Sequence, residues 1–340
     1  MMRITFEMYL RATIMLRRTP LRFFTAAKTP LSRKDGGPLV DRAEVARKMK
    51  AEIKAAMVAA VTAMGAFAAE GVATAAKSPT IQSVVGGPMN GMAMPRPSHA
   101  WVYVFVVAMA AGYLGAIFKT KRRPEWWQAL CFFASLTVTA AVVAGPLDRL
   151  AWQRVFVAYI TEQILLVMVA APLLLFGLPD WMLRPVLTRR GIRPVVRFLT
   201  RAPVAFGAFT VVFATIHYPL VCNQICHARP FYGGIRAALL AAGVLLWWPI
   251  LSPMPEFPSL PRPLQLLYLF LLIIPMTAVA APITLAQSVI YTWLEAPQPW
   301  GMTALSDQRI GGILMWVGQA LILMIAATAV FMRWSQQEGE

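Results

Sequence analysis

The chain has 340 residues, of which 58% are hydrophobic and only 14% charged, and its formal net charge is +17. This composition, with a mean hydropathy of +0.60, would leave a soluble domain with more apolar surface than it can bury, so the sequence predicts a polytopic membrane protein. The arginines lie in short connections between apolar runs, as they do in membrane loops, which argues against nucleic-acid binding.

The first hundred residues differ in character from the rest of the chain. Residues 1–52 are basic, and we expect them to be disordered or peripheral. Residues 53–99 contain the Ala-rich apolar stretch 55–69, which we interpret as a weak extra span or an uncleaved signal anchor. Two alternatives stay open: a long signal peptide, with small-x-small cleavage sites at 66–68 and 73–75, or an organellar transit peptide.

Seven apolar runs follow, each close to the ~20 residues that a helix needs to cross the hydrocarbon core. We therefore predict an all-α, polytopic transmembrane helix bundle over residues 100–333, followed by a short tail at 334–340. The predicted spans are approximately 100–118, 127–145, 155–178, 203–222, 234–252, 263–286 and 311–332.

Basic residues in the loops orient this bundle. The first loop carries four Lys and Arg residues between 119 and 123, and the third carries six arginines between 184 and 201. The even-numbered loops carry one or two each, such as Arg229 and Arg236 in the fourth. Because Lys and Arg in short loops favour the cytoplasmic side, we expect the odd-numbered loops and the C-terminus in the cytoplasm and residue 100 outside.

The chain's densest set of soft metal ligands lies at the end of the fourth predicted span, on the expected outer face: His217, Cys222, Cys226 and His227. Thiolate and imidazole ligands suit Cu(I) or Zn(II). A continuous helix would point His217 about 140° away from Cys222, so convergence needs a break, for which Pro219 is the candidate. A disulfide between Cys222 and Cys226, or residues with no role, remain the alternatives.

A second group of soft ligands precedes the first confident span. Met89, Met92 and Met94 lie in a Gly-containing segment that we expect on the same outer face. Thioethers at this spacing are typical material for capturing Cu(I). Chance clustering is the competing interpretation, because the chain contains 19 methionines.

Polar residues also enter the third predicted span, at about the depth of His217. They are Tyr159, Glu162 and Gln163. An ionisable side chain within a span predicts a functional site by default, because its burial in lipid is unfavourable. The alternative is that Glu162 lies near the interface and bonds to a neighbouring helix or reaches water.

Short motifs in the second half support a family resemblance. They are Ala171-Pro172 through Gly177-Leu-Pro179, His217-Tyr-Pro219, Trp247-Trp248-Pro249, and Ser306-Asp307-Gln308-Arg309-Ile310-Gly311-Gly312. Their order and spacing over roughly residues 100–333 resemble those of the multi-span CtaG family of bacterial cytochrome c oxidase assembly proteins. The resemblance implies a non-enzymatic helper in the bacterial inner membrane that matures a haem-copper oxidase through its copper supply. Its implied partners are the lipid bilayer and oxidase subunits or copper chaperones.

The chain departs from that family at its usual ligands. Members typically carry a His-x-x-x-His-like motif before the Ala-Pro segment, where this chain has Tyr159 and Gln163, and histidines before the fifth span, where it has residues 231–236. His217 is the family histidine that remains. We therefore expect the cysteines and methionines named above to replace the missing ligands.

The last motif is expected to be structural. Asp307 begins the seventh span, so its carboxylate is predicted to cap the N–H groups of that helix. Gly311 and Gly312 are predicted to allow close helix approach, and Pro249 to kink its helix.

Two other function classes find less support in the sequence. A small-molecule or metal-ion transporter would also have Pro- and Gly-broken helices, but paired halves are not visible in the sequence. An enzyme lacks support, because neither a nucleophile–base pair nor a His-Glu-x-x-His zinc motif occurs.

Overall fold

The computed structural model describes residues 100–338 except 153, 226–228 and 296–300. The predictions for residues 1–99, Met89, Met92 and Met94 among them, and for Cys226 and His227 fall outside this part of the chain. Within it the regular elements are all helical, which confirms the predicted all-α membrane bundle. Six of these helices are long and apolar enough to cross a membrane, or seven if one bent pair forms a single span.

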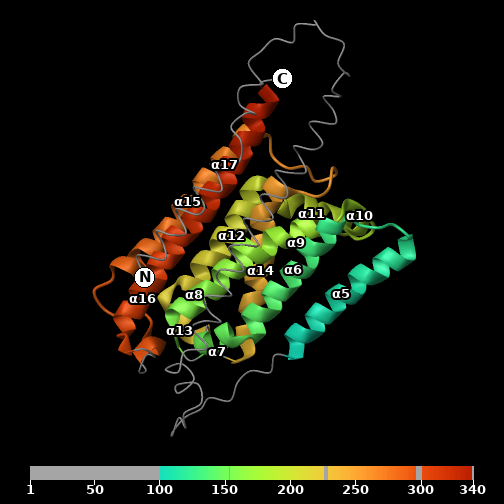
Figure 1. Cartoon of the computed structure of the whole chain (residues 1–340). Helices are drawn as coiled ribbons and strands as arrows, with labels where there is room; N and C mark the ends of the chain where they lie inside the picture. Colours follow the sequence, from blue (N-terminus) through green and yellow to red (C-terminus); the bar gives the residue numbers. More distant parts are fainter. Residues whose placement is uncertain (1–99, 153, 226–228, 296–300, 339–340) are drawn as a thin grey trace, which may run out of the picture. The chain divides into compact units, whose positions relative to one another are not determined.

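The helices follow the predicted runs closely (Figure 1). In chain order they are α5 (Ala100–Thr120), α6 (Trp126–Ala144), α7 (Pro146–Trp152), α8 (Phe156–Ile164), η1 (Leu165–Ala170), α9 (Ala171–Gly177), α10 (Asp180–Leu187), α11 (Arg193–Leu199), α12 (Ala202–His217), α13 (Pro219–Ile225), α14 (Arg229–Leu251), α15 (Arg262–Leu285), η2 (Thr292–Glu295), α16 (Ala304–Ile313), η4 (Leu314–Gly318) and α17 (Gln319–Glu338). η1 and η4 are π-helical turns, and η2 is a 3₁₀ turn.

The fourth span differs from its prediction. Instead of one run over 203–222, α12 ends at His217 and α13 starts at Pro219, because Pro219 cannot donate an N–H to continue the helix. α12 has 16 residues, about 24 Å at 1.5 Å per residue, so it is short for a complete crossing. It follows α11 through a bend of 74°.

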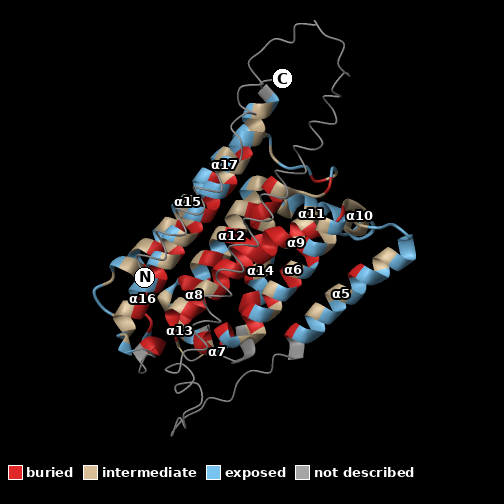
Figure 2. Ribbon diagram, viewed as in Figure 1, coloured by how far each residue is buried: buried red, intermediate tan, exposed pale blue. Residues whose placement is uncertain are grey.

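The third span, α8–η1–α9, forms the centre of the bundle. Most of its side chains are buried, and it packs against α6 and α14. Figure 2 shows the buried residues concentrated on these helices, whereas α5 lies at the edge and is largely exposed. This distribution fits a bundle in which the outer helices face lipid and the third span is shielded by protein.

The Trp-Trp-Pro motif joins α14 to its neighbours. Trp247 Nε1 donates to Val167 O of the π-helical turn η1 at 2.9 Å. Trp248 Nε1 donates to Phe257 O at 3.3 Å, and Pro249 O accepts from Leu260 N at 2.8 Å. Both indole N–H groups are therefore paired with backbone carbonyls, as buried polar groups of tryptophan usually are.

Candidate functional site at one end of the bundle

The start of α8, the end of α12 and the start of α16 lie at the same end of the bundle (Figure 1). Asp307, which is fully buried, connects two of them: its carboxylate accepts from Phe156 N at 2.6 Å and from Val157 N at 3.1 Å. Asp307 therefore caps α8, about 150 residues earlier in the chain, and not its own helix. The cap of α16 is Thr303, whose side chain accepts from Ser306 N at 3.2 Å.

Gln308, also fully buried, organises the segment that follows α15. Its Oε1 accepts from Ile290 N at 2.7 Å, and its Nε2 lies 3.4 Å from Ile283 O and 3.5 Å from Ser288 O. The neighbouring glycine Gly312 permits this close packing, since a Cβ there would lie only 2.5 Å from an atom of Thr284. The motif thus holds the loop after α15 against the end of the bundle.

His217 is the last residue of α12 and is 3% exposed. Its Nδ1 lies 2.7 Å from Phe213 O, and a carbonyl oxygen can only accept, so Nδ1 carries the proton. The lone pair then sits on Nε2, for which the described residues offer no hydrogen-bond partner. Metal-binding histidines commonly show this arrangement, in which the N–H is held by a carbonyl and the other nitrogen is available.

Aromatic side chains link His217 to the capped end of α8. Tyr291 donates its hydroxyl to His217 O at 2.9 Å, and its ring stacks on Phe156 with centroids 5.0 Å apart. Trp293 lies edge-on to Tyr159 at 5.9 Å. We call Phe156, His217, Tyr291 and Asp307 the end cluster. The cluster joins α8, α12, α16 and the 286–295 loop through buried contacts.

Three charged side chains are also buried within the bundle, and we call Asp148, Glu162 and Arg236 the ion-pair cluster. Each is at most 3% exposed. Arg236 pairs with Glu162 and lies 3.6 Å from Asp148. Glu162 is therefore inside the bundle rather than at a wet interface. Charges taken out of water in this way persist only where they are paired.

The structure brings some predicted site residues together and leaves others apart. Tyr159 belongs to the aromatic contacts, and the amide atoms of Gln163 have no hydrogen-bond partner among the described residues. Cys222 is buried in α13, five residues beyond His217. No group of three or more His, Cys, Asp or Glu in the described residues is arranged to hold a metal ion.

Comparison with known proteins decides the family. The family model of the cytochrome c oxidase caa3 assembly factor matches residues 111–337, two thirds of the chain. The chain belongs to this family. Uncharacterised proteins of Mycobacterium bovis and Mycobacterium tuberculosis are each 25% identical to it over 252 residues, which cover 68% of this chain and 38% of theirs. The chain thus spans less than half the length of these curated relatives, and no solved structure matches it.

Membership of this family agrees with the membrane setting that the long apolar helices indicate. The sequence alone did not identify Arg236 and its partner Asp148 as site residues, because Arg236 was assigned to a loop. The signal was present, because Arg236 falls at the start of an apolar run, where an arginine needs a carboxylate partner. Tyr291 gave no such signal, since its bond to His217 joins residues 74 positions apart.

Proposed function

We propose that the chain is a non-catalytic maturation factor for a haem-copper cytochrome c oxidase and that it handles copper at the extracytoplasmic face of the bacterial inner membrane. Family membership supports the assembly role. The distribution of charge supports the extracytoplasmic location. α12 runs from the arginine-rich segment 184–201 to His217, so the arginines and His217 lie at opposite ends of one helix. If the basic segment is cytoplasmic, the end cluster is outside.

The protonation pattern of His217 is the observation that carries the copper proposal. Its Nδ1–H is held by Phe213 O, and its Nε2 lone pair is buried without a partner among the described residues. A buried acceptor left unsatisfied is destabilising by about 1–3 kcal/mol, so a ligand there is favoured. Neutral imidazole nitrogen suits Cu(I). In this proposal copper is the cargo, and the fixed tautomer keeps Nε2 ready to receive it.

The other candidate ligands of the proposed site are identified from the sequence. Cys222 lies closest to His217 along the chain, and Cys226, His227 and the Met89–Met94 segment are the further candidates. They would replace the family histidines that this chain lacks at Tyr159 and Gln163. Two thiolates and an imidazole form a softer set than histidines alone, which favours Cu(I) over harder cations.

Titration with Cu(I) against a competing chelator tests the site on the full chain in detergent. His217→Ala is expected to weaken binding at least about tenfold, since even outer partners of metal ligands contribute that much. Cys131→Ala is the matched control, because it removes another buried soft side chain, in α6. Unchanged stoichiometry and affinity in His217→Ala would overturn the copper proposal.

Ion transport is the second candidate function. The ion-pair cluster favours it, because charged residues buried among spans mark ion pathways in many transporters. Proteoliposomes separate the two functions. Metal-dependent flux that Glu162→Gln abolishes would favour transport, and the absence of flux would favour assembly.

A further inference from the structure

A cavity of about 450 Å³ opens at the end of the bundle opposite the end cluster. Its wall includes Arg197, Thr200 and Arg201 from the α11–α12 junction, and Pro249 and Pro258 from the end of α14 and the loop after it. This volume falls in the range of small-molecule sites.

The charge around this cavity is strongly positive. The segment from Asp180 to Arg201 contains six arginines and one acid, a formal charge of 6 − 1 = +5. Two of these arginines, Arg197 and Arg201, line the cavity itself. Guanidinium groups match the geometry of phosphate oxygens and bind them with charge-assisted hydrogen bonds.

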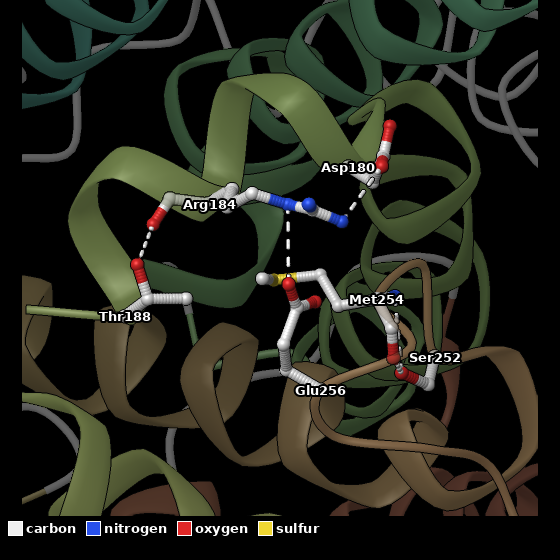
Figure 3. A network of polar contacts seen from close by, with 6 residues as sticks. All are labelled: Asp180, Arg184, Thr188, Ser252, Met254 and Glu256. Carbon is white, nitrogen blue, oxygen red and sulfur yellow. Dashed lines mark hydrogen bonds and ion pairs between the residues drawn. The ribbon is translucent and has the colours of Figure 1, made fainter.

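Glu256 is the acid among the described residues that line the cavity, and Arg184 pairs with it. Figure 3 shows the Arg184 side chain lying between Asp180 and Glu256, with Arg184 Nε 3.2 Å from Glu256 Oε1 and Nη2 3.4 Å from Asp180 Oδ2. Because Arg184 is shared between two carboxylates, it offsets only part of the Glu256 charge. The two arginines of the cavity wall, Arg197 and Arg201, are the groups that would bind an incoming anion.

The geometry of α11 indicates that this anion is part of a lipid. α11 is bent by 74° from α12, so if α12 crosses the bilayer, α11 runs nearly along its surface. Val195 and Phe198 on α11 are 55% and 54% exposed, between arginines that are also exposed. Exposed apolar side chains interleaved with arginines are typical of helices that lie among lipid headgroups. The cavity thus opens at headgroup depth.

We propose that the cavity binds the phosphate of an anionic phospholipid headgroup through Arg197 and Arg201. Basic pockets between transmembrane helices on the cytoplasmic side are suited to such headgroups. The bound lipid fixes the α11–α12 junction, where the chain turns from the surface into the span. The proposal does not depend on copper handling, because it concerns the other end of the bundle.

The proposal is tested by calorimetry, in which dihexanoyl phosphatidylglycerol is titrated into the full chain in a neutral detergent. Saturable binding is expected, and Arg197→Gln/Arg201→Gln is expected to weaken it about tenfold, as befits the loss of two charge-assisted contacts. Arg190→Gln/Arg193→Gln is the matched control: it removes the same charge from exposed positions of the same segment and should weaken binding less than about threefold. If the first double variant does not fold, each single variant should weaken binding by about threefold.

Three results would overturn the proposal. Equal weakening by both double variants would mean that diffuse charge, not the cavity, attracts the lipid. Dihexanoyl phosphatidylcholine binding as tightly as phosphatidylglycerol would remove the selection for an anionic headgroup. Inorganic phosphate binding as tightly as phosphatidylglycerol would assign the cavity to a soluble anion rather than to a lipid.

Discussion

Removing the Asp307 carboxylate tests how the end cluster is held together. In Asp307→Ala the buried N–H of Phe156 and the partly buried N–H of Val157 lose acceptors at 2.6 and 3.1 Å. Each unsatisfied buried donor is destabilising by about 1–3 kcal/mol, and some water entry will reduce the sum, so we expect a loss of about 3 kcal/mol. For a domain of this size that corresponds to a fall of roughly 6–12 °C in Tm.

Thermal unfolding in detergent, followed by tryptophan fluorescence, measures this loss. Asp307→Asn keeps one acceptor oxygen and should lose about half as much. Thr303→Ala removes the exposed cap of α16 and should lose only about 1 kcal/mol. If Asp307→Ala unfolds no earlier than Thr303→Ala, the long-range cap does not stabilise the bundle and the reasoning is wrong.

Further predictions concern other contacts and are checked by the same unfolding measurement. Arg236→Met leaves buried carboxylates uncompensated and should lower the free energy of unfolding by about 3–5 kcal/mol. Adding Glu162→Gln should restore part of this loss. A double variant that is less stable than Arg236→Met would refute the pairing. Gly312→Ala should lower the Tm because the added Cβ has no room, whereas Gly112→Ala, with open space around it, should leave the Tm unchanged. Equal effects on Tm would contradict the close packing at Gly312. Trp247→Phe removes the hydrogen bond to Val167 O and should lower the free energy of unfolding by about 1 kcal/mol. An unchanged Tm would show that this bond does not stabilise the bundle.

Hydropathy predicted the spans because helix length and apolar character are set by the bilayer and are local properties of the sequence. The break after His217 was also foreshadowed locally by Pro219, although the span was predicted to run on to residue 222. The seventh helical run begins at Ala304 rather than near 311, because Thr303 caps the helix there and the polar Asp307 and Gln308, which hydropathy excludes from a span, are buried against other elements.

The candidate site was less predictable because it depends on contacts between distant segments. Asp307 was correctly placed near the start of a helix, yet the N–H groups it caps belong to Phe156. The ion pair between Glu162 and Arg236 spans 74 positions, and an apolar run reveals an unusual charge but not its partner. Cys222 is buried, whereas Cys226 lies outside the described residues, so the structure does not test the alternative of a disulfide between them.

The most direct test of the central claim uses a strain that lacks this chain, grown at limiting copper. Cytochrome c oxidase activity and the copper content of the isolated oxidase are measured after complementation with the wild-type chain, with His217→Ala or with the control Cys131→Ala. We predict that activity and copper content fall together in the deletion strain and in His217→Ala, and that excess copper restores them. Unchanged activity and copper content in the deletion strain would contradict the assembly role.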